Sequence, residues 1–165
     1  MTTGMETERM GRCARLAWDH AVEARSGGRI ERPGVMTAHL LLGVLKEPAC
    51  AGGLILAKMG IDLAVVLAHT EFVLLHGRRR DGVDDAPVDY AGVPHTLAAR
   101  AVLDYSLEEA ALFSETYPIG TEHILLGLLR VPAGAGCRVL RFFGIDEARA
   151  RSTHDEFWQV LRLEE

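Results

Sequence analysis

An all-α fold made of two four-helix repeats is predicted from an internal duplication, helical spacing of apolar residues, and capping residues at the segment ends. Residues 36–62 (MTAHLLLGVLKEPACAGGLILAKMGID) align without a gap to residues 120–146 (GTEHILLGLLRVPAGAGCRVLRFFGID), with 14 identities among 27 positions at an offset of 84. Composition alone does not produce that density of identities, so the chain contains a repeat. We therefore predict eight helices, in two pseudo-symmetric groups of four, that form one compact unit over residues 1–165.

The composition is that of an ordinary globular protein. Of 165 residues, 48% are hydrophobic and 25% charged, and the net charge is −5. This charge argues against nucleic-acid binding, which needs a clustered basic surface. No segment reaches the ~20 apolar residues of a membrane-spanning helix, and the polar N-terminus lacks the layout of a signal peptide. We predict a cytoplasmic protein without membrane contact.

The cysteines, Cys13, Cys50 and Cys137, are odd in number and have no metal-ligand spacing. Reduced cytosolic thiols are therefore the favoured interpretation. Cys50 and Cys137 lie near the starts of equivalent predicted helices, where a thiol pKa can fall. We expect small buried thiols there and no reactive site.

The first repeat is predicted over residues 8–76, with helices at about 8–25, 38–46, 50–58 and 63–76. Apolar residues recur every three or four positions in the first of these, which is typical of an amphipathic helix. Thr37 stands where an N-cap belongs, and Asp62 can cap the fourth helix. Gly60 suits the left-handed residue that ends the third helix. The fourth helix has Val65, Val66, Phe72, Val73 and Leu75 as its apolar members.

Residues 77–93 are rich in charge, glycine and turn-forming residues, and they are predicted to link the repeats. The arginine run at 78–80 is flanked by aspartates, so we interpret it as a solvated loop and not as a binding patch. No strand is predicted here or elsewhere in the chain.

The second repeat is predicted over residues 94–163. Thr96 can cap a helix that runs to about residue 115, and Thr121, Gly144 and Asp146 repeat the capping positions of the first repeat. The last helix spans about residues 147–163. The inward stripe of the helix after Thr96 is predicted to consist of Leu97, Ala101, Val102, Tyr105, Leu112 and Phe113.

Two pairs of residues invite a functional interpretation. His39 and His123 occupy the same repeat position, but neither has a second ligand at metal spacing, so a hydrogen bond that fixes the neighbouring loop is favoured. Phe142 and Phe143 are adjacent on a helix and cannot both point inward. One of these rings should face solvent or a partner. No cofactor motif and no catalytic constellation are present, so we predict a protein that is not an enzyme.

The second repeat contains the residues that most closely resemble a known family. Residues 120–130 (GTEHILLGLLR) closely resemble the signature of the Clp repeat domain, the N-terminal domain of ClpA/ClpC/ClpB-type unfoldases, and residues 106–123 resemble the helix and loop that precede it in ClpC-type domains. The resemblance covers about residues 8–163 and implies a tandem of two four-helix repeats. There is no GxxxxGK[ST] phosphate loop. The chain therefore resembles a stand-alone Clp N-domain without ATPase modules.

What the family implies is recognition of proteins and peptides. Such domains dock adaptors and substrates for a Clp unfoldase–protease, in ClpC-type members also arginine-phosphorylated proteins, and several antibacterial cyclic peptides bind them. The family's GTEH glutamate, which holds the arginine guanidinium, corresponds to Glu122 beside Thr121. In the first repeat Ala38 stands beside Thr37, and alanine cannot accept a hydrogen bond. A first-turn glutamate also stabilises its own helix, so the role of Glu122 stays open.

The favoured function is a non-catalytic module that modulates a Clp unfoldase–protease, as an adaptor or as a competitor for adaptors and substrates. One alternative is a small-molecule binder that sequesters cyclic-peptide antibiotics directed at the unfoldase. Another is an interaction domain outside the Clp system. The candidate contact residues are Thr37, Thr121, Glu122, Phe142 and Phe143.

Overall fold

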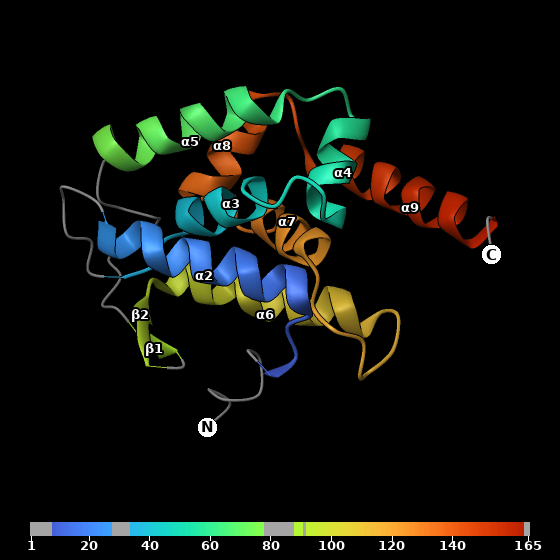
Figure 1. Cartoon of the computed structure of the whole chain (residues 1–165), viewed down its shortest axis with the longest axis horizontal. Helices are drawn as coiled ribbons and strands as arrows, with labels where there is room; N and C mark the ends of the chain where they lie inside the picture. Colours follow the sequence, from blue (N-terminus) through green and yellow to red (C-terminus); the bar gives the residue numbers. More distant parts are fainter. Residues whose placement is uncertain (1–7, 28–33, 78–87, 91, 164–165) are drawn as a thin grey trace.

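The computed structural model describes residues 8–27, 34–77, 88–90 and 92–163 (Figure 1). The arginine run at 78–80 lies outside these residues. Within them are eight α-helices, as predicted. The first group is α2 (Arg12–Gly27), α3 (Thr37–Leu45), α4 (Ala51–Lys58) and α5 (Leu63–His76); the second is α6 (Leu97–Ala111), α7 (Thr121–Leu129), α8 (Ala135–Phe142) and α9 (Glu147–Leu163).

The third helix of each group packs across onto the other group. α2 packs on α3, and α6 packs on α7. α4, however, contacts α7 and α9 of the second group, while α8 contacts α3 and α5 of the first, and Figure 1 shows α4 beside α9 and α8 beside α5. One continuous core results. Its largest fully buried side chains come from both groups: Leu40, Leu41, Ile55, Leu56, Leu103, Ile119, Ile124, Leu125, Leu126, Leu128 and Leu140.

A short hairpin corrects the prediction that the chain has no strands. β1 (Val88–Tyr90) and β2 (Val93–His95) pair antiparallel, and Gly92 between them has a positive φ of 77°. Val35, just before α3, bonds to this hairpin, because its amide donates to Pro94 O at 2.8 Å. Three-residue strands carry too little alternation to be recognised in a sequence, and this pairing depends on the distant Val35 segment.

An equivalent pairing joins the other two helix entrances. The Gly11 amide donates to Ile119 O at 2.9 Å, and the Ile119 amide donates to Arg9 O at 2.8 Å. The segment before the first helix of each group is thus hydrogen-bonded to the segment before the second helix of the other group. These two pairings place the starts of α3 and α7 in similar surroundings.

Most of the predicted capping residues are confirmed. The side chains of Asp62, Thr96 and Asp146 accept hydrogen bonds from amides in the first turns of α5, α6 and α9. Gly60 and Gly144 have φ values of 78° and 76°, in the left-handed region that ends a helix most easily at glycine. These devices are local, which explains why sequence spacing found them.

The prediction of which apolar side chains point inward is only partly right. Two members of the predicted inward stripe, Leu97 on α6 and Leu112 directly after it, are 51% and 78% exposed, whereas the small residues Ala99 and Ala110 are buried. α6 lies so close to α7 that a Cβ at Gly127 would fall 2.6 Å from Val102 O. Close helix approach selects small residues for the interface and leaves larger ones outside.

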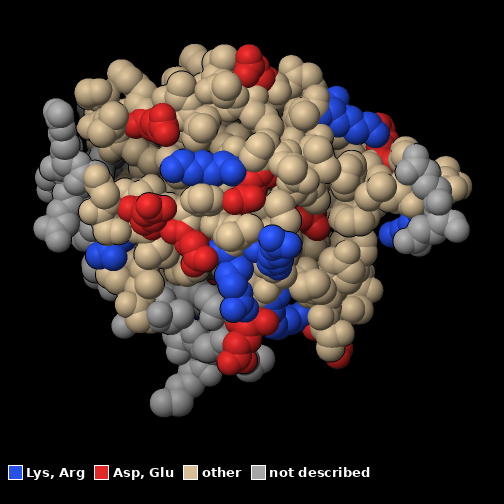
Figure 2. All heavy atoms as spheres, viewed as in Figure 1, with Lys and Arg blue, Asp and Glu red and all other residues tan. Residues whose placement is uncertain are grey.

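Helix α5 exposes much of its apolar surface. Only Val66 and Thr70 of this helix are buried, while Val65, Phe72 and Leu75 are each at least half exposed. Figure 2 shows that the part of the surface over α5 carries few charged residues, which gather instead over α2. An apolar surface of this kind is typical of a site that contacts another molecule.

The prediction of three reduced thiols is wrong for two of them. Cys13 on α2 and Cys50, the residue before α4, form a disulfide with a Cα–Cα distance of 6.1 Å and a sequence separation of 37. Cys137 is free and buried, as predicted. Cysteine counting does not reveal this bond, because the pairing depends on the fold bringing α2 near the residue before α4, which no spacing rule expresses.

Among the described helices, none by itself is long and apolar enough to cross a membrane, although α4 and α5 together pass that test as a pair bent by 112°.

Candidate functional site

The two equivalent turns that begin α3 and α7, residues 36–39 and residues 120–123, are each fixed by a histidine. His39 Nδ1 accepts a hydrogen bond from the Met36 amide at 2.9 Å, and His123 Nδ1 accepts one from the Gly120 amide at 2.8 Å. This confirms the predicted structural role. We call these segments the Met36 turn and the Gly120 turn. Because Nδ1 accepts, the proton of the neutral His123 ring resides on Nε2.

Thr37 and Thr121 do not cap their own helices, contrary to the prediction. The N-caps are Met36 and Gly120. Thr37 Oγ1 instead accepts from the Gly136 amide in the first turn of α8, and Thr121 Oγ1 accepts from the Gly52 amide in the first turn of α4, both at 2.9 Å. Each threonine therefore caps a helix of the opposite repeat. Both are fully buried, so their hydroxyls have structural partners.

Glu122 is enclosed in the Gly120 turn. Its side chain is 6% exposed, and its carboxylate lies 3.8 Å from His123 Nδ1. A Cβ at Gly120 would collide with this carboxylate, so the absence of a side chain there makes room for Glu122. In the Met36 turn the equivalent residues are Met36 and Ala38. A large side chain and a small one have thus exchanged places between the two turns.

Burial governs the protonation of this turn. Desolvation raises the pKa of Glu122, although its hydrogen bond to its own backbone and the neighbouring His154 act in the opposite direction. Desolvation, with a further contribution from His154, lowers the pKa of His123 to about 4. At neutral pH His123 is therefore an uncharged ring that holds the turn, and Glu122 ionises less readily than an exposed glutamate.

Beside the Gly120 turn, Glu109 on α6 is the centre of an ion network. Its carboxylate accepts from Arg151 on α9 at 2.6 Å and from Arg130, the residue after α7, at 3.1 Å. Burial alone would raise the pKa of Glu109, but the hydrogen bonds and charges of Arg151 and Arg130 lower it below its usual value. The network connects α6, α7 and α9. The equivalent glutamate in the first repeat, Glu23, is exposed.

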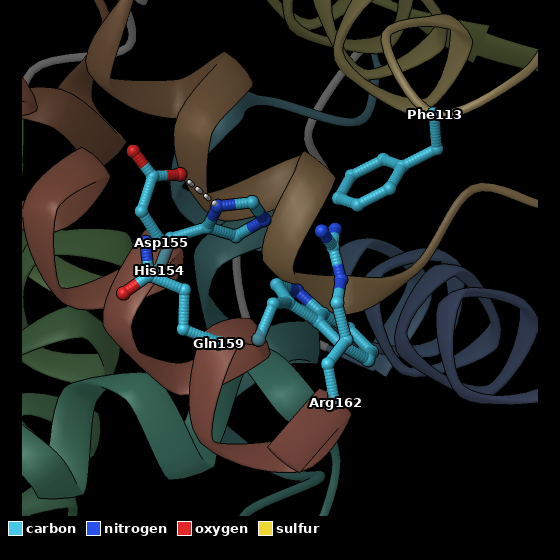
Figure 3. A pocket seen from close by; sticks show the side chains of 6 residues that line it. Phe113, His154, Asp155, Gln159 and Arg162 are labelled. Atoms are coloured by element: carbon cyan, nitrogen blue, oxygen red, sulfur yellow. Dashed lines mark hydrogen bonds and ion pairs between the residues drawn. The ribbon is translucent and has the colours of Figure 1, made fainter. Parts of the chain in front are cut away.

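A cluster of rings lies on the other side of the Gly120 turn. Phe113, in the loop after α6, has its ring centroid 5.8 Å from His123, 6.0 Å from His154 and 6.2 Å from Trp158. The cluster borders a hollow of about 210 Å³ (Figure 3). Sequence spacing did not identify Phe113 or His154 as site residues, because a loop and α9 bring them together from positions 41 residues apart.

In the described part of the chain, no group of three or more His, Cys, Asp and Glu side chains is arranged to hold a metal ion.

The comparisons with known proteins agree with this architecture. No protein-family model matches the chain. It is 30% identical over 152 residues to the ATP-dependent Clp protease ATP-binding subunit ClpC of Staphylococcus epidermidis, and 31% identical over 153 residues to ClpC of Staphylococcus aureus. In both cases the alignment covers 92% of this chain and 17% of the relative.

The fold comparison decides which part of a Clp protein the chain resembles. The crystal structure of the N-terminal domain of ClpD from Arabidopsis thaliana superposes with a TM-score of 0.69 at 22% sequence identity, covering 98% of this chain and 99% of that domain. The chain is a Clp N-domain-like protein. It spans 17% of the length of the ClpC relatives that it matches.

Helices α5 and α8 of this Clp N-domain-like protein form one further candidate contact surface. Phe142, at the end of α8, is 71% exposed and stacks on His69 of α5, with centroids 4.7 Å apart and planes at 7°. Phe143 is partly buried against the core and meets His69 edge-on at 5.4 Å. The prediction that one of the two rings faces outward is confirmed. Its role in binding stays a prediction.

The equivalent surface on α4 and α9 is charged. Lys58 occupies the place of Phe142, and its ammonium group lies 3.6 Å from the Glu156 carboxylate. Glu156 in turn occupies the place of Phe72. This chain thus presents an apolar surface on one side of its pseudo-two-fold axis and an ion pair at the equivalent place on the other side.

Proposed function

We propose that this chain is a non-catalytic recognition module of the Clp system, which binds proteins on behalf of a Clp unfoldase–protease or in competition with it. The observation that carries the proposal is the ClpC similarity, which extends over 92% of the chain. An adaptor would bring substrates to the unfoldase, and a competitor would occupy its adaptors or substrates. Either role places the protein in the cytoplasm with that machinery.

The proposed contact for arginine-phosphorylated proteins is the Gly120 turn. A helix N-terminus offers amide groups and the positive end of the helix dipole to a phosphate, and Glu122 beside it offers a carboxylate to the guanidinium. Binding requires the Glu122 carboxylate to turn outward from its place against Gly120. The two threonines beside the sites act by fixing the turns.

The Met36 turn is not expected to bind a guanidinium. Ala38 has no acceptor, and buried Met36 stands where Gly120 makes room for the Glu122 carboxylate in the other turn. A protein with one such site should bind one modified arginine per chain.

The exposed ring of Phe142 supports a second contact, with apolar groups of the partner protein. Val65 and Phe72 on α5 extend the same uncharged surface. Phe143 fixes the position of this surface from below, since its ring meets both His69 and Phe142 edge-on. Exposed aromatic residues supply much of the energy in protein interfaces.

A titration with a phosphoarginine peptide tests the Gly120 turn. Isothermal titration calorimetry should give one site, and Glu122→Gln should weaken binding by about tenfold or more, as expected for the loss of a charged hydrogen-bond partner. Since the pKa of Glu122 is raised and a guanidinium favours the ionised form, binding should weaken as the pH falls and the carboxylate becomes protonated, which titrations at several pH values measure. Exposed Glu108→Gln is the matched control. Equal binding by both variants would remove Glu122 from the site.

A degradation assay tests the wider role. Added to a ClpC-type unfoldase with its protease and an adaptor-dependent substrate, an adaptor would raise the rate of degradation and a competitor would lower it. Phe142→Lys, which copies the charge of Lys58, should abolish most of the effect. Leu112→Lys removes a similarly exposed apolar side chain, at the residue after α6, and should leave the effect on the degradation rate unchanged. An unchanged rate with the unaltered chain would contradict the proposal, and a large thermal stabilisation by antibacterial cyclic peptides would then favour sequestration.

A further inference from the structure

The Cys13–Cys50 disulfide begins beside a backbone contact with the segment that enters the Gly120 turn. Cys13 is the second residue of α2. Just before that helix, the Gly11 amide donates to Ile119 O at 2.9 Å, and Ile119 is the residue before the turn. The two segments lie so close that a Cβ on Gly11 would be 3.3 Å from the same oxygen. A shift of the start of α2 therefore acts directly on the entrance to the Gly120 turn.

The other end of the disulfide lies beside a second contact with the same turn. Cys50 is the N-cap of α4. In the first turn of that helix, the Gly52 amide donates to Thr121 Oγ1, and a Cβ on Gly52 would lie 2.9 Å from the Thr121 backbone. The disulfide thus joins the two elements that hold residues 119 and 121. Both cysteines belong to the first repeat, but the turn that they support is the one that contains Glu122.

The Met36 turn is held by contacts of the same kind without a covalent link between them. The Val35 carbonyl accepts from the Thr96 amide at 2.9 Å, and Thr37 caps the first turn of α8. At the positions equivalent to the two cysteines stand Ala99 and Gly134. Of the two turns, the Gly120 turn is therefore the one whose supports a change of oxidation state joins or separates.

The two cysteines are placed for thiol–disulfide exchange. Each is partly exposed and has an exposed neighbour, Arg12 beside Cys13 and Ala49 beside Cys50, whereas the free Cys137 is fully buried. Both also lie at a helix N-terminus, of α2 and of α4. The positive end of a helix stabilises the thiolate that forms when the bond opens, which makes such a bond easier to reduce. Disulfides in cytosolic proteins are mostly of this transient, redox-sensing kind.

We propose that the Cys13–Cys50 disulfide is a redox-controlled link that holds the Gly120 turn closed, and that a dithiol reductant of the cytosol releases it. The inference rests on the proposed function, which supplies the cytoplasmic location and the ligand of the turn. A thiolate of the reductant attacks one sulfur, forms a mixed disulfide and expels the other sulfur as a thiolate, and its second thiol then displaces the chain. Two electrons and two protons pass to the chain, which gains two thiols, while the reductant becomes a disulfide.

Reduction should favour the ligand-bound form of the Gly120 turn. The Glu122 carboxylate is enclosed against Gly120 and has to turn outward to reach a guanidinium. While the disulfide joins α2 to the start of α4, the contacts of Ile119 and Thr121 are held together and the turn stays closed. Without the bond these contacts separate more easily, which raises the fraction of chains with an open turn. The apparent affinity for a ligand rises in proportion to that fraction.

Hydrogen exchange of the folded chain, with the disulfide intact or reduced by dithiothreitol, tests the link without any ligand. Reduction should accelerate exchange in residues 119–123 by about tenfold or more relative to residues 35–39, the equivalent segment of the Met36 turn. A general loss of stability would accelerate both segments alike. The double variant Cys13→Ser, Cys50→Ser should show the reduced pattern with or without dithiothreitol, and Cys137→Ala should behave as the native chain. Equal acceleration in the two segments, or none, would overturn the proposal.

Alkylation followed by mass spectrometry measures how readily the bond opens. After incubation with dithiothreitol in the absence of denaturant, Cys13 and Cys50 should be alkylated and the buried Cys137 should not. A bond that opens only in urea would be a structural one, and the proposal would be wrong.

Binding of a labelled phosphoarginine peptide, followed by fluorescence anisotropy, measures the consequence for recognition. The reduced chain should bind at least about threefold more tightly than the oxidised chain, and the double serine variant should match the reduced chain. Equal or tighter binding by the oxidised chain would overturn the proposal. Absence of binding in both states would contradict the proposed ligand of the Gly120 turn, whereas the exchange rates decide by themselves whether the disulfide controls the turn.

Discussion

The Met36 turn and the Gly120 turn share the same hydrogen bonds but differ in the side chains that they enclose. In both, a histidine Nδ1 holds the amide three residues earlier and a threonine hydroxyl caps a helix of the opposite repeat. The contents differ because Gly120 and Glu122 stand where Met36 and Ala38 stand in the first repeat. The repeated residues are thus those that build the turn, and the differing residues are those available for recognition.

The supports of the two turns differ as well. In the first repeat the Cys13–Cys50 disulfide connects α2 to the start of α4, whereas the equivalent places in the second repeat hold Ala99 and Gly134. In the second repeat the Glu109 network connects α6, α7 and α9, and its first-repeat counterpart Glu23 is exposed. One repeat is held by a covalent bond and the other by buried charge, so the two should respond to different conditions.

The largest expected difference comes from the disulfide. Reduction, or replacement of Cys13 and Cys50 by serine, should lower the free energy of unfolding by about 3–4 kcal/mol, because a bond that closes a loop of this size restricts the unfolded chain. Urea unfolding followed by circular dichroism with and without reductant measures this. The serine variant should be insensitive to reductant. An unaltered urea midpoint on reduction of the native chain would show that the bond contributes no stability.

The Glu109 network should give the next largest effect. Glu109→Ala leaves Arg130 and Arg151 without their shared carboxylate, and we expect a loss of about 2–3 kcal/mol, less than for a fully buried pair since both arginines reach solvent. Glu23→Ala, its exposed counterpart, should change stability by less than about 0.5 kcal/mol. Equal losses would mean that burial of Glu109 is immaterial.

This network also has a defined pH dependence. The folded-state pKa of Glu109 is depressed, so its contribution is present above the unfolded value of 4.5 and is lost as the pH falls through the lower folded value. The difference in unfolding free energy between the native chain and Glu109→Ala should therefore shrink in acid. A constant difference down to the acid limit of folding would contradict this assignment.

The cross-repeat threonines should give smaller and equal effects. Thr37→Val and Thr121→Val each leave a glycine amide in a helix first turn without its acceptor, at a cost of about 1–2 kcal/mol. Thr→Ser at the same positions keeps the hydroxyl and should restore most of that loss. Thermal and urea unfolding of the four variants compare the two turns directly. If Thr→Val lowered the stability at one position and left it unchanged at the other, the two turns would not be equivalent.

The smallest effect on stability should come from Glu122→Gln, which we expect to be stabilising at neutral pH. Its folded-state pKa is raised, so the stability it allows is fully present below the unfolded value of 4.5 and declines as the pH rises through the folded value. Glu122→Gln should therefore be more stable than the native chain at neutral pH and lose that advantage in acid. A pH profile of the unfolding midpoint for both proteins measures this, and parallel profiles would show that Glu122 is ionised freely when folded.

What could be predicted from the sequence depended on local chemistry. The ends of α5 and α9, the left-handed glycines 60 and 144, and the caps at Asp62 and Asp146 follow from residues within one turn of each other, and each was found. The histidines of the two turns were also interpreted correctly, since their contact spans three residues.

What could not be predicted depends on distance along the chain. The bonds of Thr37 to Gly136 and of Thr121 to Gly52 span 99 and 69 residues, so the same threonines were assigned as caps of their own helices. The Cys13–Cys50 bond and the Phe113 hollow cannot be predicted for the same reason. Repeat alignment shows which residues are equivalent, but it does not show which copy of an element each of them touches.

The crossing of α4 and α8 has a consequence for half of this chain. A single four-helix copy would have its third helix without the surfaces of the second and fourth helices that it packs on here, and its threonine without the amide that it caps. Two such copies would supply those surfaces to each other around a two-fold axis, each lending its third helix to its neighbour. We therefore expect a half-length polypeptide to exist as an intertwined homodimer, and the present chain to be the covalently joined form of that pair.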